Sequence, residues 1–154
     1  MHPTAMKVAG VLRELGVTGD VRELPEAAPT AATAAAQLGC EIGAIANSLV
    51  FNADGTPLLV LTSGAHRVDT AKAAALAGVA TVGRVDAGSV RAWTGQSIGG
   101  VAPVGHVQPV RTFIDEDLLR HDAIWAAAGT PNAVFRLAPA DLVAMTGGRV
   151  VPIA

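Results

Sequence analysis

Four glycines, one proline and one histidine fall within twelve residues of this 154-residue chain, Gly95-Gln96-Ser97-Ile98-Gly99-Gly100-Val101-Ala102-Pro103-Val104-Gly105-His106. Such a density of glycine is incompatible with an ordinary helix or strand. It lets backbone N–H and C=O groups approach a ligand without side chains between them. Pro103 restricts the loop, and His106 can donate, accept or carry a proton. Because a simple turn needs only one or two glycines, we expect a ligand-binding loop.

Two catalytic motifs overlap this loop, and neither has the context that it needs. Gly95 to Gly99 match the G-x-S-x-G elbow of serine hydrolases, which requires a helix directly after Ser97. The two glycines and the proline that follow disfavour a helix and therefore a serine esterase. Gly100 and Gly105 have the spacing of a phosphate-binding loop, but His106 stands in place of its lysine. An NTPase is therefore disfavoured as well.

The sequence predicts no metal site, no cofactor and no disulfide. The four histidines are not spaced as a metal-binding pair, and Cys40 is the only cysteine. We interpret Cys40 as a small structural residue rather than a catalytic thiol, in keeping with a reducing interior.

Composition limits the partners. Eleven Lys and Arg residues against thirteen Asp and Glu give a net charge of −2, which argues against a surface that coats nucleic acid but permits contact with one end of it. With 3% aromatic residues and no Tyr, a stacking platform for single strands is not expected. No long uncharged apolar stretch indicates a membrane span. We expect one cytoplasmic domain over residues 1–154, without a membrane or DNA partner.

Short helices alternate with hairpins along the chain. Thr30, Asp69 and Asp86 are predicted helix N-caps, and Gly39 and Gly78 predicted helix ends. Helices are expected at residues 3–15, 31–38, 70–77, 87–93 and 139–145, with a single turn at 115–119. Strands are expected at 21–24, 47–51, 57–62, 81–85, 108–114, 123–127 and 133–137. Hairpins joining 47–51 to 57–62 and 123–127 to 133–137 favour an α+β fold with a mainly antiparallel or mixed sheet.

Four segments together resemble one known family. They are residues 47–51, residues 61–69, residues 99–106 and Ala127-Ala128-Gly129. In this order, from about residue 30 to residue 148, the chain resembles the YbaK/EbsC group, which is similar to the editing (insertion) domain of bacterial prolyl-tRNA synthetases. The resemblance implies a compact α+β domain with a mixed, partly barrel-like central sheet flanked by short helices.

The resemblance also implies a reaction. Members of the group hydrolyse, in trans, the ester between a wrong small amino acid and the tRNA 3′ end, for example alanine or cysteine on proline tRNA. Backbone N–H groups of a glycine loop can stabilise the oxyanion of that reaction. A tRNA ribose hydroxyl helps to activate water in the family mechanism, so neither a Ser–His–Asp triad nor a metal is implied.

Site residues follow from the same resemblance. The family's G-x-x-x-P loop contacts the substrate through its backbone and corresponds here to Gly99 and Pro103. The implied substrate-binding residues are Gly99, Gly100, Val101, Pro103, Gly105, Ser63, Gly64, Ala128 and Gly129. His106, which closes the loop, and Asn47 are the implied catalytic residues.

Asn47 departs from the family pattern. Many members carry a lysine there, and asparagine keeps a hydrogen-bond donor without the positive charge. Two functions stay open: a trans-acting aminoacyl-tRNA deacylase, or a non-catalytic module that binds an aminoacyl-tRNA end, an amino acid or a synthetase. The expected partners are the acceptor end of an aminoacyl-tRNA and a synthetase.

Overall fold

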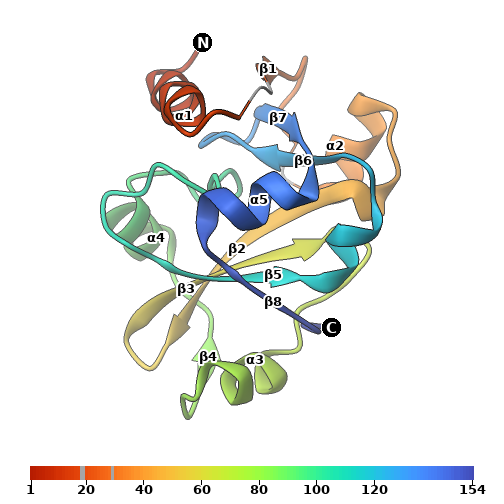
Figure 1. Cartoon of the computed structure of the whole chain (residues 1–154). Helices are drawn as coiled ribbons and strands as arrows, with labels where there is room; N and C mark the ends of the chain where they lie inside the picture. Colours follow the sequence, from red (N-terminus) through yellow and green to blue (C-terminus); the bar gives the residue numbers. More distant parts are fainter. Residues whose placement is uncertain (18–19, 29) are drawn as a thin grey trace.

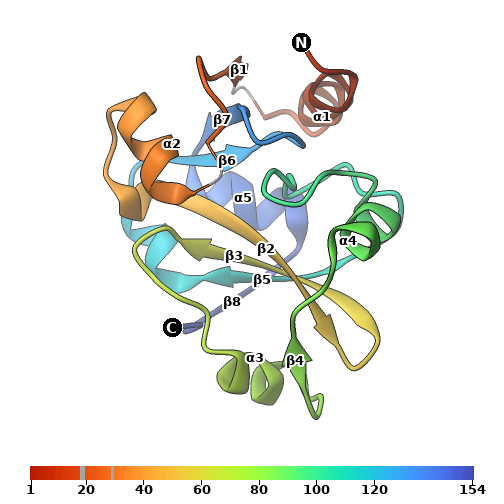
Figure 2. The same ribbon diagram turned by 180° about the vertical axis from the view of Figure 1, so that it is seen from behind.

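One mixed β-sheet of eight strands organises the chain (Figures 1 and 2). The computed structural model describes residues 1–17, 20–28 and 30–154. The strands are β1 (Val21–Glu23), β2 (Ile45–Ala53), β3 (Thr56–Ser63), β4 (Val82–Gly83), β5 (Arg111–Asp115), β6 (Ile124–Ala127), β7 (Ala133–Leu137) and β8 (Arg149–Val151). The α-helices are α1 (Pro3–Glu14), α2 (Ala31–Leu38), α3 (Thr70–Ala77), α4 (Ala87–Thr94) and α5 (Pro139–Thr146), and the 3₁₀ turns are η1 (Ile42–Ala44) and η2 (Glu116–Arg120).

The strand order is β1-β7-β6-β2-β3-β5-β8, with β4 paired to β2 off this path. The hairpins β2–β3 and β6–β7 are antiparallel, as predicted. Three longer-range pairs, β2–β6, β3–β5 and β5–β8, are parallel. The mixed sheet expected from the sequence is therefore confirmed.

The core lies on both faces of the sheet. On the inner face Ala46, Leu61 and Ile114 belong to the larger apolar cluster, which also receives residues of α1, α4, α5 and the glycine-rich loop. On the outer face Val60 and Phe113 pack with α3 and the C-terminal strand. A third, smaller cluster joins α2 to the start of β2 and to β6. In Figure 1, α1 and α3 lie at opposite ends of the molecule.

The predicted helix caps are confirmed because their hydrogen bonds are local. The side chains of Thr30, Asp69 and Asp86 each accept a hydrogen bond from the backbone N–H three residues later. Gly39 and Gly78 end α2 and α3 in the left-handed conformation, with φ of 67° and 71°.

Several predicted boundaries were wrong. Strand 108–114 begins only at Arg111, because β5 is paired on both edges and Pro109 cannot donate to a ladder. Strand 81–85 is reduced to Val82–Gly83, the two residues that pair with β2. Conversely, β2 begins before residue 47, since its first two residues pair with β6.

The buried face of α1 consists of Ala5, Val8 and Leu12. Met6 and Leu15 lie outside it and are 57% and 49% exposed. No helix in the described ranges is long and apolar enough to cross a membrane.

Candidate functional site

Two connected hollows open at the fork where β6 diverges from β2. The smaller, here called the inner pocket, has a volume of about 40 Å³, and the larger, the outer groove, about 530 Å³. The two share six lining residues, Thr30, Ala31, Asn47, Ser48, Gly99 and Val101. The inner pocket is otherwise walled mainly by alanines of α2, β2, β6 and β7, with Trp125 and Pro131. The two hollows are therefore contiguous, and the smaller one is largely apolar.

The glycine-rich loop forms one wall of this site. Gly99, Gly100 and Val101, which were expected to bind substrate, line the inner pocket. A Cβ at Gly100 would lie 2.2 Å from the backbone carbon of Thr130, so only glycine fits against the β6–β7 turn. The carbonyl of Gly100 also accepts a hydrogen bond from the N–H of Gly129 at 2.8 Å. Two distant segments are thereby joined at the pocket.

Gln96 holds this loop from within, a role that the sequence analysis did not identify. Its side chain is 2% exposed. The Oε1 atom accepts a hydrogen bond from Ala102 N–H at 2.7 Å, and Nε2 donates to the carbonyls of Val104 and Gly105 at 3.1 and 3.3 Å. Because glutamine is usually exposed, the residue type gives no indication that this side chain is buried and hydrogen-bonded to the loop backbone.

His106 lies away from the pocket. Its Nε2 donates to the carbonyl of Ala102 at 2.7 Å, and its side chain lines a separate surface hollow with Leu15 and Met145. Burial lowers the pKa of His106, and the hydrogen bond to Ala102 offsets this only in part. His106 thus fixes the far side of the loop through Ala102, and its lowered pKa favours the neutral imidazole. It does not bring His106 to Asn47.

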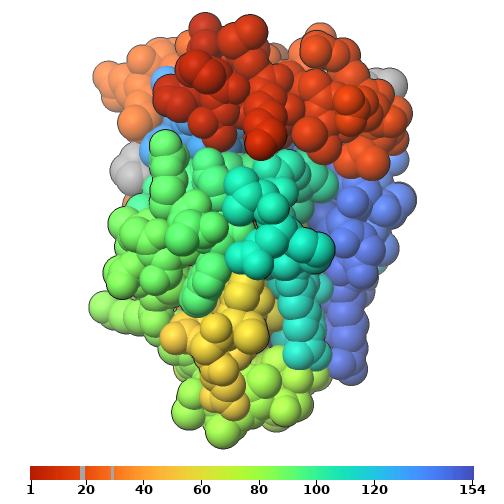
Figure 3. Space-filling view, turned by 90° about the vertical axis from the view of Figure 1, so that its left-hand side faces the viewer, coloured from red at the N-terminus to blue at the C-terminus, as the bar shows by residue number. Residues whose placement is uncertain are grey.

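Pro103 and Gly105 share this position behind the pocket. Both line the hollow that contains His106 and neither lines the inner pocket or the outer groove. Gly105 has φ of 82°, which favours glycine, and packs near Val8 of α1. Figure 3 shows the red N-terminal segment lying across the end of the molecule, directly against the green and teal segment that contains the loop. These residues shape the loop from the side opposite to the ligand space.

Of the remaining expected site residues, one lines the outer groove and three lie behind the two hollows. Gly64 lines the outer groove, where a Cβ would lie 2.5 Å from the carbonyl oxygen of Ile42. Ser63 is buried beside the groove, and its hydroxyl donates to the carbonyl of Gly43 at 3.0 Å. Ala128 is fully buried in the core, and Gly129, with φ of 99°, faces α1. Ser63, Ala128 and Gly129 therefore support the site without lining it.

The chemistry available in the inner pocket is that of amides, hydroxyls and backbone groups. No titratable side chain is among its lining residues. In the described chain the side-chain amide of Asn47 makes no hydrogen bond, and Ser48 Oγ is the one buried side-chain polar atom without a partner. The N–H groups of Gly99 and Val101 have no acceptor within the described protein, whereas Gly100 N–H donates to Ser97. Two residues that line the pocket thus have N–H groups free to donate to a ligand.

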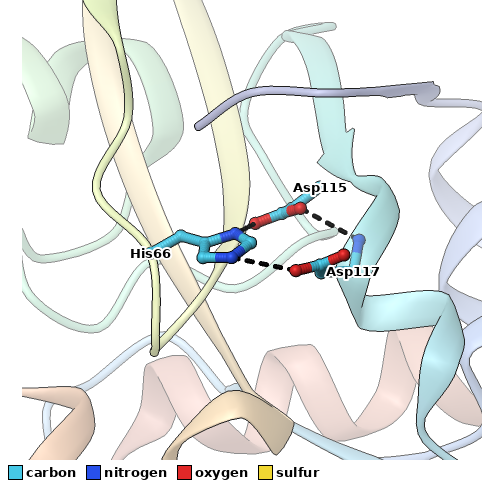
Figure 4. A group of neighbouring side chains, drawn as sticks. All are labelled: His66, Asp115 and Asp117. Carbon is cyan, nitrogen blue, oxygen red and sulfur yellow. Dashed lines mark hydrogen bonds and ion pairs between the residues drawn. The ribbon is translucent and has the colours of Figure 1, made fainter.

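A charged cluster stiffens the wall of the outer groove (Figure 4). His66 lies between two carboxylates, with Nδ1 2.8 Å from Asp115 Oδ2 and Nε2 2.9 Å from Asp117 Oδ2. Each ring nitrogen therefore lies within hydrogen-bond distance of a carboxylate oxygen. Burial raises the pKa of Asp115, but hydrogen bonds from the N–H groups of Asp117 and Ser63 and from His66 outweigh it and hold that pKa below its usual value.

This cluster is better described as a histidine held between two carboxylates than as a metal site. Its three side chains bring ligand atoms within 4.8 Å of one another. A metal needs a ring nitrogen without a proton, however, and both nitrogens of His66 already face carboxylates. The cluster also leaves His66 no free nitrogen to act as a general base.

The serine of the G-x-S-x-G match has no catalytic surroundings. Ser97 follows the end of α4 and is itself followed by turns rather than by a helix, as predicted. Its hydroxyl accepts a hydrogen bond from Arg91 Nη1 at 3.2 Å. A serine esterase through Ser97 is therefore not supported by the geometry.

Comparisons with known proteins agree with one another. The sequence profile of the aminoacyl-tRNA editing domain matches residues 25–145. The uncharacterised protein YwhH of Bacillus subtilis (strain 168) is 29% identical over 124 residues, covering 80% of this chain and 78% of its own length. A proline–tRNA ligase of Nitratidesulfovibrio vulgaris (strain Hildenborough) is 32% identical over 132 residues, which cover 79% of this chain but only 23% of the ligase.

A solved structure extends the similarity to nearly the whole chain. It is described as that of a candidate trans-editing enzyme for prolyl tRNA synthetase, and it superimposes with a TM-score of 0.93 at 42% identity, covering 99% of this chain and 98% of its own. The fold expected from the family resemblance is thereby confirmed.

Proposed function

Because the chain belongs to the aminoacyl-tRNA editing domain family, we propose that it is a trans-acting deacylase that hydrolyses the ester between a small mischarged amino acid and the tRNA 3′ end. The size of the inner pocket carries this proposal. A cavity must exceed about 10–15 Å³ to hold one water, so about 40 Å³ leaves room for only a few non-hydrogen atoms. The alanines around it suit a short, uncharged side chain.

Free backbone donors supply the catalytic element. Ester hydrolysis passes through a tetrahedral oxyanion, which the unpartnered N–H groups of Gly99 and Val101 are placed to stabilise. One such donor is typically worth about 10²–10³ in rate. Since no titratable side chain lines the inner pocket, we assign activation of the water to a ribose hydroxyl of the substrate. Asn47 then contacts the ester or the terminal ribose.

The proposed partners follow from the substrate. The acceptor end of an aminoacyl-tRNA occupies the outer groove, and an aminoacyl-tRNA synthetase is a second proposed partner because a proline–tRNA ligase contains a related segment. Because its proposed substrate is freshly charged tRNA, we propose a cytoplasmic location for the protein.

Incubation with a panel of mischarged tRNAs tests the proposal. We expect alanyl or cysteinyl esters on proline tRNA to be hydrolysed faster than in buffer, and the rate to be unchanged in the Ser97→Ala control. If no charged tRNA loses its amino acid faster than in buffer, the protein is not a deacylase.

A binding module remains the second candidate, because the inner pocket lacks any charged group and Asn47 replaces the family lysine. The variants Asn47→Lys and Asn47→Met separate the two. They add side chains of similar length, but only lysine adds charge. Hydrolysis that is absent from the wild type and from Asn47→Met but present in Asn47→Lys would establish a binding module derived from an enzyme.

A further inference from the structure

The floor of the outer groove is a strand edge without a strand beside it. β2 pairs with β6 only through Ile45 and Ala46, and with β4 only through Asn52 and Ala53. Residues 47–51 lie between these two pairings, and four of them line the outer groove. The sheet is therefore split at the position where the ligand space opens.

The pairing of β2 with β3 fixes which backbone groups face the split. Ile45 accepts a hydrogen bond from Gly64 N–H at 2.8 Å, so Ile45 directs its backbone toward β3. Because inward and outward residues alternate along an antiparallel pair, Ser48 and Val50 direct their N–H and C=O groups away from β3. Within the described chain these groups have no hydrogen-bond partner. The orphaned hydroxyl of Ser48 belongs to the same strand segment.

Such an edge presents an acceptor next to a donor. The C=O of one residue and the N–H of the residue two positions later lie on the same side of an extended strand. Here they are the carbonyl of Ser48 and the amide of Val50. A planar ligand that carries a donor beside an acceptor on one edge satisfies both at once. The amino group and N1 of adenine form such an edge, whereas hypoxanthine has the reversed pattern on a ring of the same shape.

The walls of the groove favour a nucleotide over an extended peptide. Ile42 and Ile98 line the groove and are 40% and 53% exposed, so they offer apolar contacts for a base. Arg67 lines the same groove and forms no ion pair within the described chain, which leaves its guanidinium free for a phosphate. A volume of about 530 Å³ lies within the usual range for small-molecule sites.

We propose that the outer groove holds the terminal adenosine of the tRNA, with its base read by the Ser48 carbonyl and the Val50 amide and its phosphate bound by Arg67. This inference rests on the proposed function and adds a base-reading subsite to it. The nucleotide would lie directly against Asn47 and Gly99, where the groove meets the inner pocket, so its ribose and ester reach the free N–H groups.

Titration of ¹⁵N-labelled protein with adenosine 5′-monophosphate and inosine 5′-monophosphate tests the subsite without any hydrolysis. We expect about tenfold or more tighter binding of the adenine nucleotide, since the reversed pattern leaves both backbone groups unpaired. The Val50 amide proton should move downfield, while the amides of Asn47 and Leu49, which face β3, should change less. Equal affinity for the two nucleotides, or shifts confined to another face, would overturn the inference.

Two further measurements separate this inference from the deacylase proposal. Arg67→Ala should weaken binding of the monophosphate but not of adenosine, and Lys72→Ala, whose ammonium group contacts the Ala154 carbonyl instead, should weaken neither. Equal deacylation of mischarged tRNAs that end in adenosine or inosine would refute base reading and leave the deacylase intact. Selective nucleotide binding without deacylation of any tRNA would refute the enzyme and leave the subsite intact.

Discussion

The side-chain carbonyl of Gln96 accepts a hydrogen bond from the backbone N–H of Ala102 at 2.7 Å, inside the loop that walls the inner pocket. The other end of the same amide donates to two carbonyls further along the loop. One buried side chain thereby sets the conformation in which the N–H groups of Gly99 and Val101 remain free for a ligand. These three hydrogen bonds restrain the loop despite its glycines.

Replacement of this amide should therefore damage stability and activity together. Gln96→Leu leaves two buried backbone groups and one partly buried group without partners, and each fully buried group costs about 1–3 kcal/mol. We expect a loss of at least about 2 kcal/mol in urea unfolding and a large fall in the deacylation rate. In Gln96→Glu, a carboxylate facing two carbonyls should be stable only when protonated, so its deficit should shrink as the pH is lowered. A Gln96→Leu protein as stable as the wild type would contradict this account of the loop.

A methyl group at Gly100 should separate the loop from the β6–β7 turn. The new Cβ would lie 2.2 Å from Thr130 C, so backbone must move. We expect Gly100→Ala to lower the unfolding free energy by about 1–3 kcal/mol and to enlarge or close the inner pocket. Gly83→Ala is the matched control, because nothing lies within 4 Å of its Cβ and its φ is ordinary. Similar stabilities for the two variants would show that the contact with Thr130 is unimportant.

Much of the local structure was predictable because its signals are local. The caps at Thr30, Asp69 and Asp86 bind N–H groups three residues away, and the turns of both hairpins lie between adjacent strands. The parallel pairs were not predictable, since β3 and β5 meet across a long intervening segment. The divergence of β6 from β2 after Ala46, which creates the site, has no local signature.

The family resemblance implied three substrate-binding glycines that line the two hollows, Gly64, Gly99 and Gly100. Close approach of backbone excludes a Cβ at Gly64 and Gly100, whereas nothing lies within 4 Å of a Cβ at Gly99, whose φ of 85° favours glycine instead. His106 was expected beside the substrate because histidine can transfer protons. The same ring nitrogens can equally hydrogen-bond a backbone carbonyl and hold a loop in place. Contact of His66 with Asp115, across 49 positions, depends on the pairing of β3 with β5 and could not be read from spacing.

We propose that His106 positions the loop and does not transfer a proton. His106→Ala should then lower the melting temperature and the rate together, and His106→Gln, which keeps a donor for the Ala102 carbonyl, should restore most of both. A stable His106→Gln protein without activity would return His106 to a catalytic role.

The pH dependence of stability gives an independent readout of the same histidine. Because burial lowers its pKa below 6.5, the unfolded chain binds a proton first as the pH falls. The lowered pKa of His106 therefore contributes to the free energy of unfolding. This stabilisation is complete above pH 6.5 and declines as the pH falls from 6.5 to the lowered pKa of the folded protein. Urea unfolding of the wild type across this window should show the decline, and His106→Gln should lack it.

Asp115 should protect the fold against acid. Its pKa is held below the usual 3.8, because hydrogen bonds from Asp117, Ser63 and His66 outweigh the opposing effect of burial. The resulting stability is present above about pH 3.8 and is lost as the pH falls through the lower folded value. Asp115→Asn should be less stable than the wild type at pH 7, with a smaller difference at pH 3. Asp122→Asn, at an exposed position, should match the wild type at both pH values.

Comparison of alanyl-tRNA and prolyl-tRNA, both on proline tRNA, tests the central claim most directly. An inner pocket of about 40 Å³ should admit the single methyl of alanine and exclude the ring of proline. One or two extra methylenes are worth about 1–3 kcal/mol each, or roughly tenfold and more in rate. We predict that single-turnover hydrolysis with the enzyme in excess removes alanine at least about tenfold faster than proline. Equal rates for the two esters, or no acceleration of either over buffer, would contradict a size-selective deacylase.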